Sequence, residues 1–221
     1  MQKIMFNDRY GLTDAVIEGR KIMTRRSINL MLKDCATVHK NCRGADWSDK
    51  PMHLIVDRDT GGIYCQYCGN GVRLHDGGYH YKTKYKVGEV VAVAQSYEQV
   101  DPQIVHFRTD DLGDMIGDHP GQSNKMFVKA ELMPHQIRIT GIRCERLQDI
   151  SDYDCFREGI SESWYESTDT TTYGFTDEKK GTAVEFDTPR EAFAALIDKV
   201  SGRGTWKSNP WVVVYEFELV K

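Results

Sequence analysis

Apolar and polar residues recur along this chain with two periods, one typical of helices and one typical of strands. Apolar residues at helical spacing predict a helix over residues 12–18, and the capping-box spacing of Ser151 and Asp154 predicts a short one over residues 152–158. A third, over residues 189–200, has an apolar stripe of Phe193, Leu196, Ile197 and Val200. Gly19 and Gly159 follow the first two, where helices commonly end in a glycine. The third begins with a Thr-Pro-x-Glu pattern, which supplies an N-cap and a proline for the first turn.

Strand patterns lie between and after these helices. Residues 87–97 are apolar on both faces for most of their length, which indicates a central strand. Residues 137–145 alternate but change phase at Gly141, which predicts a β-bulge there. Residues 211–220 alternate as a strand with one face in the core, and residues 21–26 are expected to be extended.

Two segments interrupt this pattern. Residues 31–82 are polar, glycine-rich and cysteine-bearing, and we interpret them as an insertion in the main domain. Within them, two short apolar runs flank a turn-forming stretch over residues 57–62, which predicts a hairpin. Residues 161–187 are rich in Ser, Thr, Asp and Glu without a clear period, and we expect a mobile loop.

Few strands, one bulge and short helices favour an α+β fold. We expect a small, partly open β-barrel with short helices across its ends, interrupted by the polar insertion. The 221 residues are sufficient for one hydrophobic core, so residues 1–221 are expected to form a single domain.

The overall charge argues against broad binding to nucleic-acid phosphates. The formal net charge is −4 and the isoelectric point is about 6.0, whereas such proteins are usually basic. A nucleic-acid role must therefore rest on a local basic patch or a small substrate. Neither a signal peptide nor a membrane-length apolar stretch is visible, so the expected location is the cytoplasm.

The strongest local basic patch follows the first helix and contains Arg20, Lys21, Arg25 and Arg26, with the hydroxyl of Thr24 among them. A buried lysine beside other cations loses its proton more readily, and a neutral lysine can activate a hydroxyl or a water. A regular strand would direct Lys21 and Thr24 to opposite faces, so this chemistry requires a kink. The alternative is that the two later arginines form surface ion pairs and Lys21 binds phosphate passively.

The cysteines suggest a metal site in the insertion. Cys65 and Cys68 have the Cys-x2-Cys spacing of a zinc knuckle, and Cys35 and Cys42 are the candidate partners, with His39 as a substitute. A segment with so few apolar residues would gain stability from structural zinc. The alternative is a pair of reduced cysteines at a strand end.

The basic patch also has the form of a known signature. Gly19-x-Lys21-x-x-Thr24-x-Arg26 resembles the motif of ASCH domains, a branch of the PUA-like superfamily. Four further segments resemble the family in the same order: Tyr85–Val93, Met133-Pro134, Leu147–Ile160 and Gly204–Trp211.

The resemblance implies a PUA-like fold with a cleft for RNA or a nucleotide-like ligand. One bacterial branch, the acetylcytidine amidohydrolases, uses a Lys and a Thr of this motif with a distant Glu, which correspond to Lys21, Thr24 and Glu158. Many ASCH domains have Glu in place of the threonine, so Thr24 favours the hydrolytic branch. The expected function is hydrolysis of an N-acylated cytidine or a related nucleoside.

The candidate substrate-binding residues are Arg20, Arg25, Arg26, Tyr97 and Trp206, the two aromatics as stacking platforms for a base. The expected partner is a nucleoside or single-stranded RNA, with no membrane and no obligate protein partner. Two alternatives stay open: a non-catalytic RNA-binding module that uses the same cleft, and a zinc-stabilised interaction module dominated by the insertion.

Overall fold

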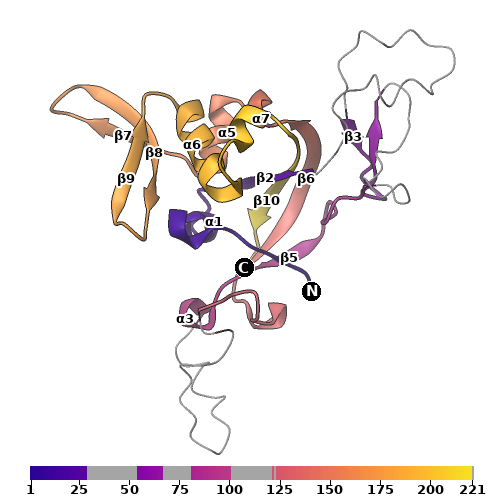
Figure 1. The fold of residues 1–221 in the computed structure, drawn as a ribbon. Coiled ribbons are helices and arrows are strands. Elements are labelled where there is room, and N and C mark those ends of the chain that lie inside the picture. Colours follow the sequence, from indigo (N-terminus) through magenta and orange to yellow (C-terminus); the bar gives the residue numbers. More distant parts are fainter. Residues whose placement is uncertain (29–53, 67–80, 101–120, 122, 221) are drawn as a thin grey trace, which may run out of the picture.

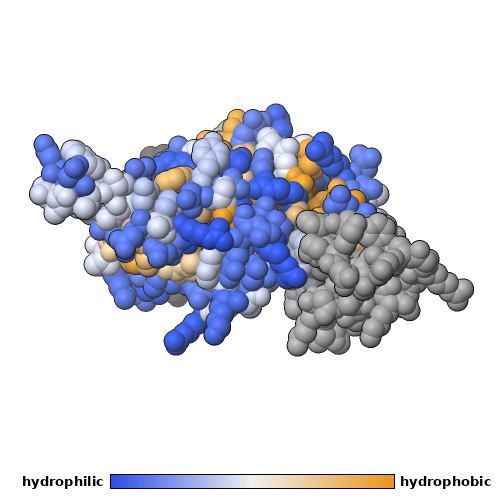
Figure 2. Space-filling view, turned by 90° about the horizontal axis from the view of Figure 1, so that it is seen from above, coloured by the Kyte–Doolittle hydropathy of each residue, from blue (hydrophilic) through white to orange (hydrophobic). Residues whose placement is uncertain are grey.

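The structure is a computed structural model that describes residues 1–28, 54–66, 81–100, 121 and 123–220. These residues form a mixed α+β fold (Figure 1). In this part of the chain, no helix is both long and apolar enough to cross a membrane. Figure 2 shows mainly hydrophilic residues on one face of the molecule, with hydrophobic residues in small groups between them.

The main sheet has five strands in the order β1-β5-β6-β10-β2. β1 runs parallel to β5, and all other neighbours are antiparallel. β5 lies inside the sheet, which confirms the central strand predicted from its apolar sequence. The strands span Lys3–Ile4 (β1), Val90–Val93 (β5), Gln136–Arg146 (β6), Trp211–Leu219 (β10) and Met23–Ser27 (β2).

The sheet does not close, so the predicted β-barrel is wrong. β1 and β2 lie at opposite ends of the strand order and do not pair with each other. A barrel needs every strand to pair on both edges with a consistent stagger, and the two residues of β1 are too few to continue the ladder. Figure 1 shows instead an open sheet whose long strand β6 curves beside a group of helices.

β6 bends at the predicted bulge. Glu216 of β10 lies opposite Gly141, whereas the next residue, Phe217, lies opposite Ile139. Thr140 is therefore the extra residue on β6, and an extra residue of this kind bends a strand and increases its twist. The phase change in the sequence is confirmed as a bulge.

The three predicted helices are confirmed with slightly different ends. The helices are α1 (Leu12–Ile17), α3 (Tyr97–Val100), α5 (Asp152–Arg157), α6 (Pro189–Ser201) and α7 (Thr205–Ser208). Single 3-10 turns occur at Asp8–Tyr10, Ala130–Leu132 and Leu147–Asp149. α6 buries Phe193, Leu196 and Ile197 of the apolar stripe that its sequence predicts, whereas Val200, the fourth predicted residue, is exposed in the last turn.

Residues 161–187 are not a loop, and that prediction is wrong. They form an antiparallel sheet of β7 (Ser161–Tyr165), β8 (Thr170–Asp177) and β9 (Thr182–Phe186). Both faces of these strands are mostly polar, so the apolar alternation that usually reveals a strand is absent. Phe175 anchors the sheet, since it is buried and its ring lies edge-on to that of Tyr10 at 5.6 Å between centroids.

The predicted hairpin is confirmed as β3 (Leu54–Val56) and β4 (Ile63–Cys65). Leu54, Ile63 and Cys65 belong to the main hydrophobic core, so the hairpin packs against the body of the protein.

Candidate functional site

The chain turns sharply between α1 and β2, and this turn positions Lys21. Gly19 has a φ of +75°, a conformation that glycine adopts without strain. The Lys21 amide then donates to the carbonyl oxygen of Ala15 at 2.8 Å, and the Ile22 amide donates to that of Arg157 at 3.0 Å. β2 begins only at Met23, so Lys21 lies outside the regular strand.

A cavity of about 250 Å³ lies next to this turn, and we call it the first cavity. Lys21, Thr24 and Glu158 all line it, because the turn before β2 removes the strand alternation between Lys21 and Thr24. Its apolar wall includes Phe6 and Leu196. The structure thus brings together the three residues that the sequence motif suggests as catalytic.

Lys21 and Glu158 form a buried pair. Lys21 Nζ lies 2.5 Å from Glu158 Oε2 and 2.7 Å from the Glu158 carbonyl oxygen. Glu158 follows the last residue of α5, where helix carbonyls lack an intrahelical partner, so its main-chain oxygen is free to accept this bond. Both side chains are at most 5% exposed.

Burial lowers the pKa of Lys21, because an ammonium group loses its hydration in the interior. The carboxylate of Glu158 acts in the opposite direction, and the positive charges of Arg26 and Arg25 add to the lowering. The lysine therefore gives up its proton more readily than an exposed lysine does.

Thr24 is almost fully buried, and its side chain lines the first cavity. Its hydroxyl makes no side-chain hydrogen bond to any residue in the described part of the chain. It is therefore available to a molecule in the cavity, whereas Lys21 and Glu158 are already joined to each other.

Arg25 holds the other carboxylate oxygen of Glu158. Its Nη1 lies 3.0 Å from Glu158 Oε1, and its Nη2 lies 2.7 Å from Glu145 Oε1 and 3.1 Å from Asp154 Oδ2. Burial by itself would lower the pKa of Arg25, but the carboxylates of Glu158 and Glu145 raise it above the ordinary value. Arg25 therefore stays charged and fixes Glu158 from the side opposite Lys21.

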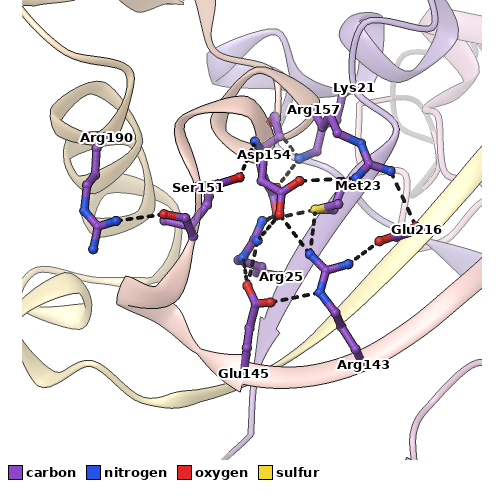
Figure 3. Close-up of polar contacts among 12 residues, drawn as sticks. Lys21, Met23, Arg25, Arg143, Glu145, Ser151, Asp154, Arg157, Arg190 and Glu216 are labelled. Atoms are coloured by element: carbon purple, nitrogen blue, oxygen red, sulfur yellow. Dashed lines mark hydrogen bonds and ion pairs between the residues drawn. The ribbon is translucent and has the colours of Figure 1, made fainter.

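A second layer of ion pairs supports Arg25 (Figure 3). Arg143 of β6 contacts Glu145 at 2.9 Å, Asp154 at 2.8 Å and also Glu216 of β10. Arg157 contacts the other oxygen of Asp154 at 3.2 Å. Networks in which every charge has several partners fix side-chain positions, although their net stabilisation is small.

Of the remaining predicted binding residues, only Arg26 lines the first cavity. Arg26 is exposed and lines the first cavity. Arg20 pairs with Glu18 on the surface and is not a lining residue. Tyr97 is buried in a separate small cluster with Val128 and Met133, and Trp206 packs edge-on against Phe193. Neither aromatic lines the cavity, so the structure does not bring these two to the site.

Of the four cysteines predicted as zinc ligands, Cys65 lies in the described part of the chain. Cys35, Cys42 and Cys68, with His39, lie outside the described residues. Cys65 is buried on β4 as part of the main core. Where the structure describes the chain, no group of three or more His, Cys, Asp or Glu side chains is arranged to hold a metal ion.

Sequence reasoning missed the residues that surround the motif. Phe6 lines the first cavity, and its ring centroid lies 5.9 Å from Lys21 Nζ and 5.8 Å from the guanidinium carbon of Arg26. Glu145 and Asp154 hold Arg25. Their acidic character is visible in the sequence, but no spacing rule connects them with Arg25, 120 and 129 positions away.

We compared the chain with protein-family models, with curated proteins and with solved structures, and none of them matched.

Proposed function

We propose that the chain is an ASCH-type amidohydrolase that removes the acyl group from an N-acylated cytidine or a related nucleoside. The observation that carries the proposal is the buried Lys21–Glu158 pair, joined at 2.5 Å in a cavity that Thr24 also lines. Amide hydrolysis needs a nucleophile, a base and a proton donor for the leaving amine, and these three residues supply such groups.

The hydrogen bonds of Lys21 suit the role of base. A neutral amine has two N–H groups, which can donate to Oε2 and to the carbonyl oxygen of Glu158. The lone pair is then left for the proton of Thr24. Burial, which lowers the pKa of Lys21, favours this neutral form.

In the proposed reaction the Thr24 oxygen attacks the acyl carbon, and its proton passes to Lys21. The C–N bond then breaks, and the nucleobase amine takes the proton relayed through Lys21 and Glu158. A water molecule, deprotonated by the same lysine, hydrolyses the acyl-threonine ester, which releases the carboxylic acid and restores the hydroxyl. Arg25 keeps the Glu158 carboxylate in place throughout.

Turnover of N4-acetylcytidine tests the proposal, with release of cytidine and acetate measured by liquid chromatography. Because each group transfers a proton or attacks the substrate, Lys21→Ala, Thr24→Val and Glu158→Gln should each lower kcat by about 10²–10⁴-fold. Thr24→Ser keeps the hydroxyl and should retain most activity. Lys179→Ala removes an exposed lysine in the β8–β9 turn and serves as the matched control.

Absence of turnover on any acylated cytidine would overturn the proposal, and so would full activity of Lys21→Ala. The second candidate is a module that binds a nucleoside or RNA without turnover. It is favoured by the direct contact of Lys21 with Glu158, since a fully ionised pair would hold a ligand but would not accept a proton. Binding without product release would identify this case.

A further inference from the structure

A second cavity, of about 270 Å³, adjoins the first. Met5 and Arg26 line both cavities, so the two are neighbours along one surface. Each has less volume than the roughly 300–1,000 Å³ of a typical ligand pocket, whereas together they fall within that range. A ligand larger than a single acylated base can therefore occupy both.

The second cavity has a firmly held aromatic wall. Tyr85 and Tyr215 are both buried, and their rings meet edge-to-face at 5.2 Å between centroids. The Tyr85 hydroxyl donates to the main-chain oxygen of Lys3 at 3.0 Å. The Tyr215 hydroxyl accepts the main-chain amide of Lys84 at 3.0 Å. These bonds hold the rings and the backbone of Lys84 before any ligand arrives.

Two cations border this cavity, and neither contacts a carboxylate of the residues that the structure describes. The Lys84 ammonium group lies 5.2 Å from the centroid of the Tyr85 ring, and the Arg26 guanidinium group donates to the main-chain oxygen of Met5. Among the described residues, neither cation forms an ion pair. Lys21 and Arg25, by contrast, both contact the buried carboxylate of Glu158. Of the cations that line the two cavities, those that contact no carboxylate in the described part of the chain are thus Arg26, which lines both, and Lys84, which lines the second.

We propose that the second cavity binds a phosphate of the substrate, so that the protein acts on a nucleotide rather than on a free nucleoside. This inference rests on the proposed function, which assigns the acylated base to the first cavity. Arg26, shared by both cavities, and Lys84 hold the phosphate oxygens, and the guanidinium group offers two parallel donors to them. A free nucleotide and a nucleotide within an RNA strand present the same phosphate.

Equilibrium binding tests the subsite without any dependence on turnover. Isothermal titration compares cytidine with cytidine 5′-monophosphate, cytidine 3′-monophosphate and a short oligoribonucleotide that contains one cytidine. Because hydrogen bonds to charged groups are strong, the wild type should prefer a phosphate-bearing ligand by roughly 10- to 100-fold. The preference should weaken as salt is raised. The tightest ligand distinguishes a free nucleotide from a strand.

Variants with the same change of charge test whether the phosphate preference arises at the second cavity. Arg26→Gln and Lys84→Gln should each remove most of the phosphate preference. Lys84 lines only the second cavity, so Lys84→Gln should also leave cytidine binding within about threefold. Lys86→Gln makes the same charge change two positions further on, at an exposed residue that lines neither cavity, and should keep the preference.

Equal affinity of the wild type for cytidine and for every phosphate-bearing ligand would overturn the subsite, as would an undiminished preference in both variants. The two proposals fail separately. Loss of all turnover with a retained, Arg26-dependent phosphate preference would overturn only the hydrolase. Turnover of N4-acetylcytidine that a phosphate does not improve, with equal binding, would overturn only the subsite.

Discussion

Two opposing effects act on the pKa of Lys21. The carboxylate of Glu158 favours the ammonium form, whereas burial disfavours it, and burial has the larger effect on its pKa. The same residue on the surface would be an ordinary charged lysine with a pKa near 10.4. Its chemistry therefore depends on the cavity wall as much as on the motif that contains it.

The lowered pKa of Lys21 predicts how the rate depends on pH. The neutral amine is the base, so kcat/KM for the acylated substrate should be low where Lys21 is protonated. It should rise with pH through the lowered pKa and level off below about pH 10.4. Lys21→Arg cannot lose its proton and should lose the rising limb together with the activity. A wild-type profile that shows no rise at any pH below about 10.4 would contradict the assignment of the base.

Arg25 is a positioning residue, because its proposed role is to hold the carboxylate of Glu158 in place. One guanidinium group contacts three carboxylates that come from β6, α5 and the residue after α5. The motif supplies the arginine, but its partners lie 120–133 positions away. Spacing rules reach a few residues, so this arrangement could not be predicted from the sequence. The three proposed catalytic residues, in contrast, came from the motif and its resemblance.

At the scale of elements, local signals identified most helices and strands. Capping residues and glycines gave the ends of α5 and α6, because these act within one helical turn. The polar strands β7, β8 and β9 escaped detection, since they are held by backbone ladders and cross-strand polar contacts. One of these is the bond from the Tyr165 hydroxyl to Glu185 at 2.6 Å.

The N-cap of α6 gives a stability prediction. The Thr188 hydroxyl accepts the Glu191 amide at 3.2 Å and donates to the Glu191 carboxylate at 3.0 Å. Thr188→Ala should lower the free energy of unfolding by about 1 kcal/mol, because an amide at the helix start loses its partner. Thr188→Ser should cost less, since it keeps both bonds. Urea unfolding measures the difference, and an unchanged midpoint in Thr188→Ala would contradict the role of the cap.

At the scale of the molecule, the order of the strands determines whether the main sheet closes, which the sequence pattern does not predict. The apolar pattern predicts that strands exist, but not which edges meet, because pairing depends on contacts between distant segments. The expectation of a barrel failed at that step. The structure has three separate sheets in its described part, and the main sheet is open at β1 and β2.

This arrangement predicts unequal protection from hydrogen exchange. β6 and β10 pair with neighbours on both sides, and the central part of β10 is buried, so their amides should exchange the slowest. β7 and β9 lie at the edges of a largely exposed sheet and should exchange earlier. Hydrogen exchange followed by mass spectrometry at neutral pH measures both. Exchange of β7 and β9 as slow as that of β10 would show that the small sheet belongs to the same cooperative unit.

The pairing of β2 with β10 also has a consequence for synthesis on the ribosome. Residues 23–27 meet residues 212–216, and Lys21 meets Glu158 across 137 positions. Chains emerge from the N-terminus at about 5–20 residues per second, and contacts between distant segments form late. Lys21 is thus made several seconds before its partner Glu158, and β2 is made longer still before β10. The nascent chain therefore contains the Gly19–Arg26 motif well before the first cavity can form.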